Sequence, residues 1–203
     1  INPGDFAFWQ DSELSNSTWV FVANEGNYGA SNGSISMIDE LGNVRTIEGV
    51  GDVVQSLAIY KNKLIVIVNN SHSIKIYQIT ENGITTPAVE ISTGNSSPRE
   101  MVIINNSMYF TNWNSQDVKI LNLNNYNIDG TIAVGIMPED IISDGENLWV
   151  ANSGGSTVSR IDIISQVVET FEVGEGPQSL AILDNDLYIS RTYYDIYWNA
   201  FYG

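Results

Sequence analysis

The chain has 203 residues, of which 43% are hydrophobic and 16% charged, a balance that indicates a folded protein with a buried core and excludes a disordered chain. The 24 acidic and 8 basic residues give a formal net charge of −16, which opposes binding to the phosphate backbone of nucleic acids. Because the chain has no cysteine and a single histidine, thiolate chemistry, zinc clusters and sites that need two imidazoles are excluded.

Short strand-like runs alternate along the chain with clusters of asparagine and serine, which are typical of turns. In chain order, the clearest runs are 19–22, 64–68, 108–110, 148–150 and 187–189. No segment has the periodicity of an amphipathic helix, and no apolar run approaches the roughly 18 residues that span a bilayer. The sequence therefore predicts an all-β chain.

A repeat of about 40 residues runs through the sequence. Each repeat contains a residue that opens a strand, usually proline: Val54, Pro98, Pro138 and Pro177. Each also contains an asparagine after an apolar run: Asn24, Asn69, Asn112 and Asn152. A third strand-like column lies at 34–39, 73–77, 117–121 and 157–162, and a looser fourth column at 131–135 and 170–174. Four short strands in each such unit are the signature of a β-propeller blade.

We therefore predict a β-propeller with four-stranded blades, in which residues 1–203 form a single, incomplete propeller domain. The predicted blades are 6–50, 51–94, 95–135, 136–174 and 175–203, the last of them partial. Seven such blades need about 280 residues, so we expect this chain to belong to a longer protein with a seven-bladed ring. One large side chain in each second strand is expected to fill the space between blades: Phe21, Val66, Tyr109, Trp149 and Tyr188.

The repeat resembles the YVTN family of β-propellers. The run N-E-G-N-Y-G within 22–29, together with 52–57, 97–99 and 111–113, is similar to YncE-like surface lipoproteins of Bacteroidetes. This resemblance implies a cell-surface or periplasmic protein that is associated with the outer membrane through a lipid anchor upstream of Ile1. It also implies an outer-membrane transporter as partner and, by analogy with the cobalamin-capturing members, a cobalamin-like ligand. The alternative is a scaffold subunit docked in an outer-membrane transport or secretion assembly.

A binding site is expected on one rim of the propeller. Adjacent strands are antiparallel, so the start of each first strand and the end of each second strand meet on the same face. The residues that differ at these repeated positions are the ones that a site built on a repeat scaffold would use. The predicted ligand- or partner-binding residues are Tyr28, Gln55, Arg99, Trp113, Glu139, Gln178, Arg191 and Tyr193.

Some residues on this rim have a structural interpretation as well as a functional one. Trp113 is expected to be exposed and to stack on a planar ligand or a sugar. Arg99 and Glu139 occupy equivalent positions in adjacent repeats, so they are also candidates to pair with each other. The asparagine column is expected to close turns, and His72 to be an exposed loop residue. The aromatic C-terminus could be core for further blades rather than part of the site.

No catalytic motif is present: the sequence lacks a G-x-S-x-G elbow, a P-loop, an H-E-x-x-H run and an EF-hand calcium loop. We therefore predict a binding module that is not an enzyme, with no metal, no cofactor and no nucleic-acid partner. An enzyme that hydrolyses sugars or lactones is a further alternative, because some propellers do so.

Overall fold

The computed structural model describes residues 18–194 and 199–203. Residues 6–17 of the predicted first blade, and 195–198 of the aromatic C-terminal run, lie outside the described part. All helical or extended structure within the described residues is β-strand, which confirms the all-β prediction. In the same residues, no helix is long and apolar enough to cross a membrane.

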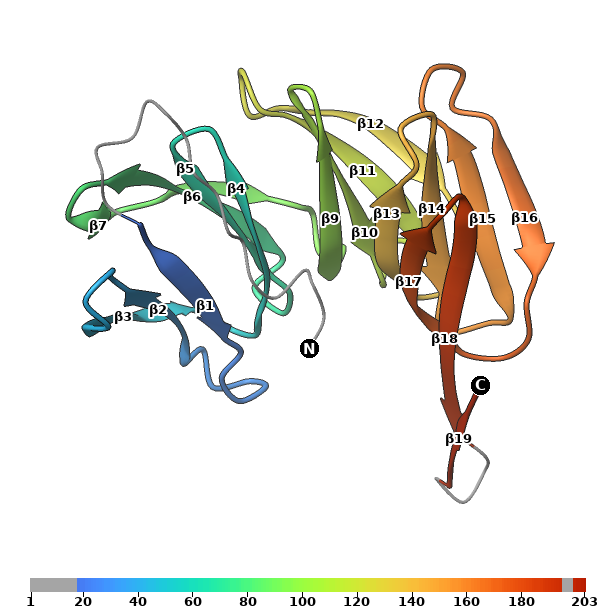
Figure 1. Cartoon of the computed structure of the whole chain (residues 1–203), viewed down its shortest axis with the longest axis horizontal. Coiled ribbons are helices and arrows are strands. Elements are labelled where there is room, and N and C mark those ends of the chain that lie inside the picture. The colour runs from blue at the N-terminus through green and yellow to red at the C-terminus, as the bar shows by residue number, and fades with distance from the viewer. Residues whose placement is uncertain (1–17, 195–198) are drawn as a thin grey trace. The chain divides into compact units, whose positions relative to one another are not determined.

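The described strands form five sheets that follow one another along the sequence (Figure 1). The chain divides into two compact units, residues 1–98 and 99–203, with the boundary at the start of β9 (Pro98–Ile104). Four strands begin at the residues that the repeat predicts to open them: Val54, Pro98, Pro138 and Pro177.

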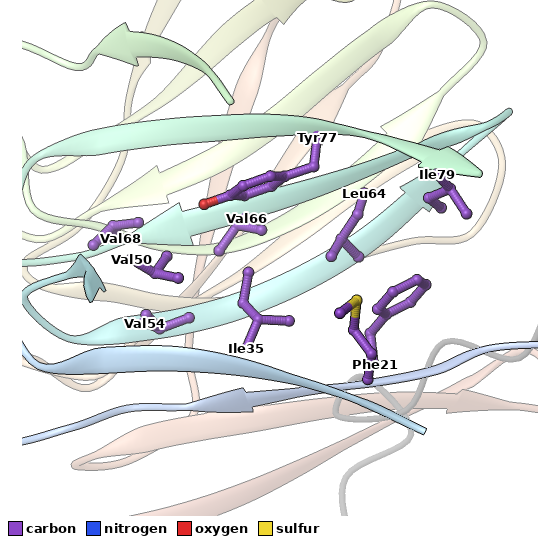
Figure 2. Close-up of a cluster of buried hydrophobic side chains, with 10 residues drawn as sticks. Phe21, Ile35, Val50, Val54, Leu64, Val66, Val68, Tyr77 and Ile79 are labelled. Atoms are coloured by element: carbon purple, nitrogen blue, oxygen red, sulfur yellow. The ribbon is translucent and has the colours of Figure 1, made fainter. Parts of the chain in front are cut away.

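The first unit holds two sheets, in the orders β1-β2-β3 and β4-β5-β6-β7, with β8 also paired to β6. Their bounds are β1 Val20–Asn24, β2 Gly33–Ile38, β3 Val44–Gly51, β4 Val54–Tyr60, β5 Lys63–Val68, β6 Ser73–Thr80, β7 Gly83–Ile84 and β8 Val89–Ser92. The two sheets share one hydrophobic cluster, shown in Figure 2: Phe21, Ile35, Met37, Val50, Val54, Leu64, Val66, Val68, Tyr77 and Ile79. In β5, every side chain from Leu64 to Val68 is fully buried, so this strand is a continuous apolar run rather than an alternating one.

The second unit holds three sheets, in the orders β9-β10-β11-β12, β13-β14-β15-β16 and β17-β18-β19. Their bounds are β9 Pro98–Ile104, β10 Ser107–Asn112, β11 Asp117–Asn122, β12 Ile128–Ala133, β13 Pro138–Ser143, β14 Asn147–Asn152, β15 Thr157–Asp162, β16 Val168–Glu172, β17 Pro177–Leu183, β18 Asp186–Tyr194 and β19 Ala200–Tyr202. Each sheet opens with a proline, which fits the first residue of a strand because it has no ladder donor to satisfy.

The three sheets of the second unit pack one on the next. One cluster joins the β9–β12 sheet to the β13–β16 sheet through residues such as Val118, Ile120, Leu148 and Val150. A second cluster joins the β13–β16 sheet to Leu180 of β17 and its neighbours in β18. Two four-stranded sheets and a third that ends the chain therefore share a layered core, in which each sheet buries a face that it could not cover alone.

The asparagine column bridges strands inside the sheets. Asn152 is fully buried; its side-chain amide donates to the hydroxyl oxygens of Thr157 and Ser159, both at 3.0 Å, and its Oδ1 accepts the Gly135 N–H at 3.0 Å. Asn112 is also fully buried and donates to the Asp117 carbonyl of β11 at 3.4 Å, as well as to the Phe110 carbonyl of its own strand at 3.0 Å. The column is expected to close turns, and the Asn152 carbonyl does accept the Gly155 N–H at 3.0 Å in the turn after β14, but its side chain bonds instead to β15 and to the loop before β13.

The column of large side chains follows the prediction only in part. Phe21, Val66 and Tyr109 are buried and Trp149 is half-buried, whereas Tyr188 is 54% exposed. The strand register explains the difference. Tyr188 lies opposite Ala181, whereas the next pair, Leu180 and Ile189, points into the core. Successive side chains in a strand point to opposite faces, so Tyr188 lies on the outer face of the last sheet.

The turn between β13 and β14 contains an acidic side chain with a strongly altered pKa. Burial by itself raises the pKa of Asp144, but the hydrogen bonds to its carboxylate have a larger, opposite effect. The pKa is therefore lowered to about 2 from the ordinary value of 3.8. The donors are the Asn147 N–H at 2.7 Å, the Trp149 indole at 2.8 Å and the Glu146 N–H at 2.9 Å. The ionised carboxylate therefore stabilises this turn.

Replacing Asp144 with asparagine is expected to lower the free energy of unfolding by about 1 kcal/mol at neutral pH, a value reduced for solvent screening of this exposed group. Because folding lowers the pKa, the stabilisation is complete above 3.8 and is lost as the pH falls through about 2. Urea unfolding of parent and variant should therefore differ at neutral pH and converge in acid. Asp186→Asn, at an exposed position in β18, is the matched control. An equal difference at both pH values would contradict the assignment.

Candidate functional site

The second unit contains a pocket of about 630 Å³, a volume within the range of small-molecule sites. It lies where the starts of β9, β13 and β17 meet the loops after β10 and β14 and the distal part of β18. The lining residues are Arg99, Trp113, Met137, Glu139, Ser153, Gly154, Gly155, Ser156, Glu175, Gly176, Gln178, Thr192, Tyr193 and Tyr194. The pocket thus brings together five of the eight residues that the repeat singles out: Arg99, Trp113, Glu139, Gln178 and Tyr193.

An ion pair between adjacent repeats forms one wall of the pocket. The Arg99 Nε donates to both Glu139 carboxylate oxygens, at 3.0 and 3.1 Å, and Nη2 donates to Oε1 at 2.6 Å. The two side chains are only 16% and 11% exposed. The expected pairing of Arg99 with Glu139 is confirmed, and its geometry is the bidentate fork that binds a carboxylate most strongly. The positive charge of Arg99 is therefore already balanced before any ligand arrives.

Trp113 differs from the expectation of an exposed aromatic side chain. The Arg99 guanidinium lies 4.1 Å from the centre of its ring, and the residue is half-buried. The indole nitrogen is buried and has no hydrogen-bond partner among the described residues. Trp113 follows the end of β10, as predicted, but the cation from β9 covers one face of the ring. Its first role in the structure is to hold Arg99 rather than to offer that face to a ligand.

The opposite wall comes from the end of β18. This strand runs on beyond its pairing with β17, and Thr192, Tyr193 and Tyr194 pair with β19 instead (Figure 1). The Tyr193 ring stacks on Phe201 of β19, with centroids 5.1 Å apart and planes 14° apart. Phe201 thus fixes the orientation of Tyr193, and Tyr194 is 58% exposed at the edge of the pocket. An aromatic ring held in place in this way is a platform for a flat or ring-shaped molecule.

The polar groups between these walls are available for a ligand. The side chains of Glu175, Gln178 and Thr192 make no hydrogen bond or ion pair with other residues in the described part of the chain. Glu175 and Gln178 are both exposed. Carboxylate, amide and hydroxyl groups together offer both donors and acceptors.

A glycine brings this edge of the pocket together. Gly176 has a φ of +68°, and a β-carbon there would collide with the Thr192 carbonyl oxygen. Its own N–H donates to the Gly155 carbonyl at 2.9 Å, and its carbonyl accepts the Thr192 N–H at 2.8 Å. The loop before β17 can therefore approach β18 closely, which places Glu175 and Gln178 beside the aromatic wall.

Three predicted residues do not line this pocket. Tyr28, which is 80% exposed, and Gln55 belong to the first unit. Arg191 precedes the pocket residue Thr192, but its guanidinium packs against Gly174 and Gly203 so closely that a β-carbon at either glycine would collide with it. His72 also differs from its expectation: it is half-buried, and its Nδ1 accepts the Ser97 N–H at 3.1 Å. His72 thus holds the loop at Ser97 in place within the first unit.

Glu175, Thr192 and the glycine loop 153–156 also line the pocket, although the repeat did not single them out. The signal for Glu175 lay in the V-G-x-x-P repeat, whose two variable positions precede the proline that opens β17. Those positions occupy the same rim as the residues that follow the proline. Within the described chain, no group of three or more histidine, aspartate or glutamate side chains could hold a metal ion.

No known protein family and no characterised relative matches the sequence. The fold is similar to that of solved structures. One, from Bacteroides uniformis, is provisionally named a 6-phosphogluconolactonase; it has 12% identity and a TM-score of 0.68, over 85% of this chain and 61% of that chain. A second, from Bacteroides fragilis and provisionally given the same name, has 16% identity and a TM-score of 0.66, over 95% and 71%. The dihydro-heme d1 dehydrogenase NirN, in complex with DHE, has 14% identity and a TM-score of 0.62, over 86% and 40%.

These likenesses show a β-propeller-like, all-β fold. This chain spans 61% of the length of the Bacteroides uniformis protein and 40% of NirN. The prediction that the chain is not an enzyme is contradicted, because two of the structures that share its fold are named after an enzyme activity. That prediction rested on the absence of familiar catalytic motifs. Such an absence is weak evidence in a fold that carries many unrelated chemistries.

Proposed function

We propose that the pocket of the second unit binds a small polyhydroxylated molecule of the sugar class. The observation that carries this proposal is the Tyr193 ring, held by its stack on Phe201, beside polar side chains that have no partner in the described chain. The apolar faces of a sugar ring pack on an aromatic side chain, while its hydroxyl groups need the mixed donors and acceptors that Gln178, Thr192 and Glu175 supply.

The pocket wall formed by Arg99 is preorganised, which supports the same proposal. Arg99 is fixed by Glu139 on one side and by Trp113 on the other, so this wall needs no rearrangement when a ligand binds. Preorganised walls improve affinity because less conformational freedom is lost on binding. The names of the two Bacteroides proteins add sugar-lactone hydrolysis as a second candidate activity, and the pocket carries two carboxylates, Glu139 and Glu175, beside which water could be polarised.

Tyr193→Ala is expected to weaken binding of a pocket ligand about tenfold, because an aromatic stack contributes about 1 kcal/mol or more. The measurement is a titration followed by saturation-transfer NMR, with glucose and D-glucono-1,5-lactone as probes, and the lactone sample also reports any hydrolysis. Tyr188→Ala is the matched control, since Tyr188 lies on the same strand, is 54% exposed and does not line the pocket. Equal binding by parent and Tyr193→Ala would contradict the proposal, as would equal losses in the two variants.

The wider setting is also a proposal. We propose that the sheets are blades of a seven-bladed propeller of the YVTN type, anchored at the cell surface, that captures a ligand for an outer-membrane transporter. The repeat of about 40 residues supports the blades, and the resemblance of the N-E-G-N-Y-G run supports the setting. In the alternative, a scaffold subunit, a partner chain would cover the pocket. Intact-mass analysis of the natural protein with its co-purifying partners distinguishes the two.

A further inference from the structure

The charges around the pocket point to a narrower class of ligand, in an inference that rests on the proposed function. We propose that the pocket selects an amino-bearing sugar over an uncharged one and rejects a phosphorylated one. Selection of this kind depends on which charged groups the ligand contacts in the pocket, because a charge that loses its water without gaining a partner raises the free energy of binding.

Arg99 is the single cationic side chain among the described lining residues, and it is already paired with Glu139. Arg99 makes three hydrogen bonds of 2.6 to 3.1 Å with the Glu139 carboxylate, and one face of its guanidinium is covered by Trp113. A phosphate would have to compete with Glu139 for the same donors and would leave that buried carboxylate without its partner. The neighbouring cation, Arg191, packs on Gly174 and Gly203 and does not line the pocket.

The remaining charge in the pocket is negative. Glu175 lines the pocket, is exposed, and has no ion pair or hydrogen bond from its side chain in the described chain. Glu172 lies next to the pocket as well, since its carboxylate accepts the hydroxyl of the lining residue Ser156 at 2.6 Å. The whole chain carries a net charge of −16, so its long-range field also attracts cations and repels anions. An ammonium group would meet Glu175 directly.

The aromatic wall favours the same sign of charge. The face of the Tyr193 ring carries the negative part of the ring quadrupole, which attracts a cation placed over it. The pocket already contains one such contact, between Arg99 and Trp113. Glu175, from the loop before β17, and Tyr193, from β18, therefore recognise an amine together, while the Arg99–Glu139 pair contributes no net charge.

The test uses three probes with the same ring: glucosamine, glucose and glucose 6-phosphate. Titrations followed by NMR, at a pH where the amine is protonated, are expected to give the tightest binding for glucosamine, about fivefold weaker binding for glucose and the weakest for glucose 6-phosphate. The preference for glucosamine should shrink as salt is added, since screening weakens the attraction to Glu175.

Two variants separate the contributions. Glu175→Gln should lose most of the preference for glucosamine over glucose, whereas Glu146→Gln, an exposed glutamate of the same unit away from the pocket, should keep the parent preference. Glu139→Gln releases the charge of Arg99 and should raise the affinity for glucose 6-phosphate. Binding of glucose 6-phosphate as tight as that of glucose by the parent protein would overturn the inference, as would an unchanged preference in Glu175→Gln. If none of the probes binds, or if Tyr193→Ala leaves all three affinities unchanged, it is the proposed function that fails.

Discussion

Replacing Asn152 with alanine is expected to lower the free energy of unfolding of the second unit by about 3 kcal/mol. The side chain is fully buried and makes three hydrogen bonds of 3.0 Å, to the Gly135 N–H and to the hydroxyl groups of Thr157 and Ser159. Alanine removes all three, and it leaves the fully buried Ser159 hydroxyl and the half-buried Gly135 N–H and Thr157 hydroxyl without this partner. Each such group costs about 1 kcal/mol or more, and the emptied space adds to the loss.

Urea unfolding followed by intrinsic tryptophan fluorescence measures this effect. Asn124→Ala is the matched control: Asn124 belongs to an exposed turn of the same unit, and its side chain makes no hydrogen bond to other described residues. The control should stay within about 0.5 kcal/mol of the parent. A loss of stability in Asn152→Ala no larger than in Asn124→Ala would show that the repeated asparagine does not hold the sheet together.

Arg99→Ala is the second change with a large expected effect, a loss of about 3 kcal/mol in the free energy of unfolding. It leaves the Glu139 carboxylate, whose side chain is 11% exposed, without the guanidinium that makes three hydrogen bonds to it. It also uncovers the face of Trp113. A buried charge without its partner costs more than the intact pair contributes, because the pair repays only part of its own desolvation.

The double variant Arg99→Met with Glu139→Met tests this reason directly. It removes both charges, keeps apolar volume at the two positions, and is expected to recover most of the stability lost in Arg99→Ala. The measurement is the same urea unfolding, with Arg160→Ala as control, because the Arg160–Glu169 pair is a more exposed ion pair of the same unit. A double variant as unstable as Arg99→Ala would contradict the explanation.

The local order of the chain follows closely from its residues. Proline at 98, 138 and 177 opens β9, β13 and β17, and the asparagine at 152 ends β14. These positions are predictable because proline and asparagine impose backbone constraints on their immediate neighbours. The convergence of strand starts and strand ends on one rim follows in the same way, from antiparallel pairing alone. It led to Arg99, Glu139 and Gln178 without knowledge of any distance.

The exposure and the contacts of each side chain were set by packing against the neighbouring strand or loop. Trp113 follows a strand end as predicted, yet Arg99 covers its face because β9 and β10 are neighbours in one sheet. Glu175 enters the pocket because Gly176 allows its loop to approach Thr192, and Tyr193 is held by Phe201 of the following strand. A repeat predicts the position of a residue in its own blade, because strand geometry is local. Exposure, charge balance and stacking depend on which neighbouring segment fills the adjacent space, so only the tertiary structure determines them.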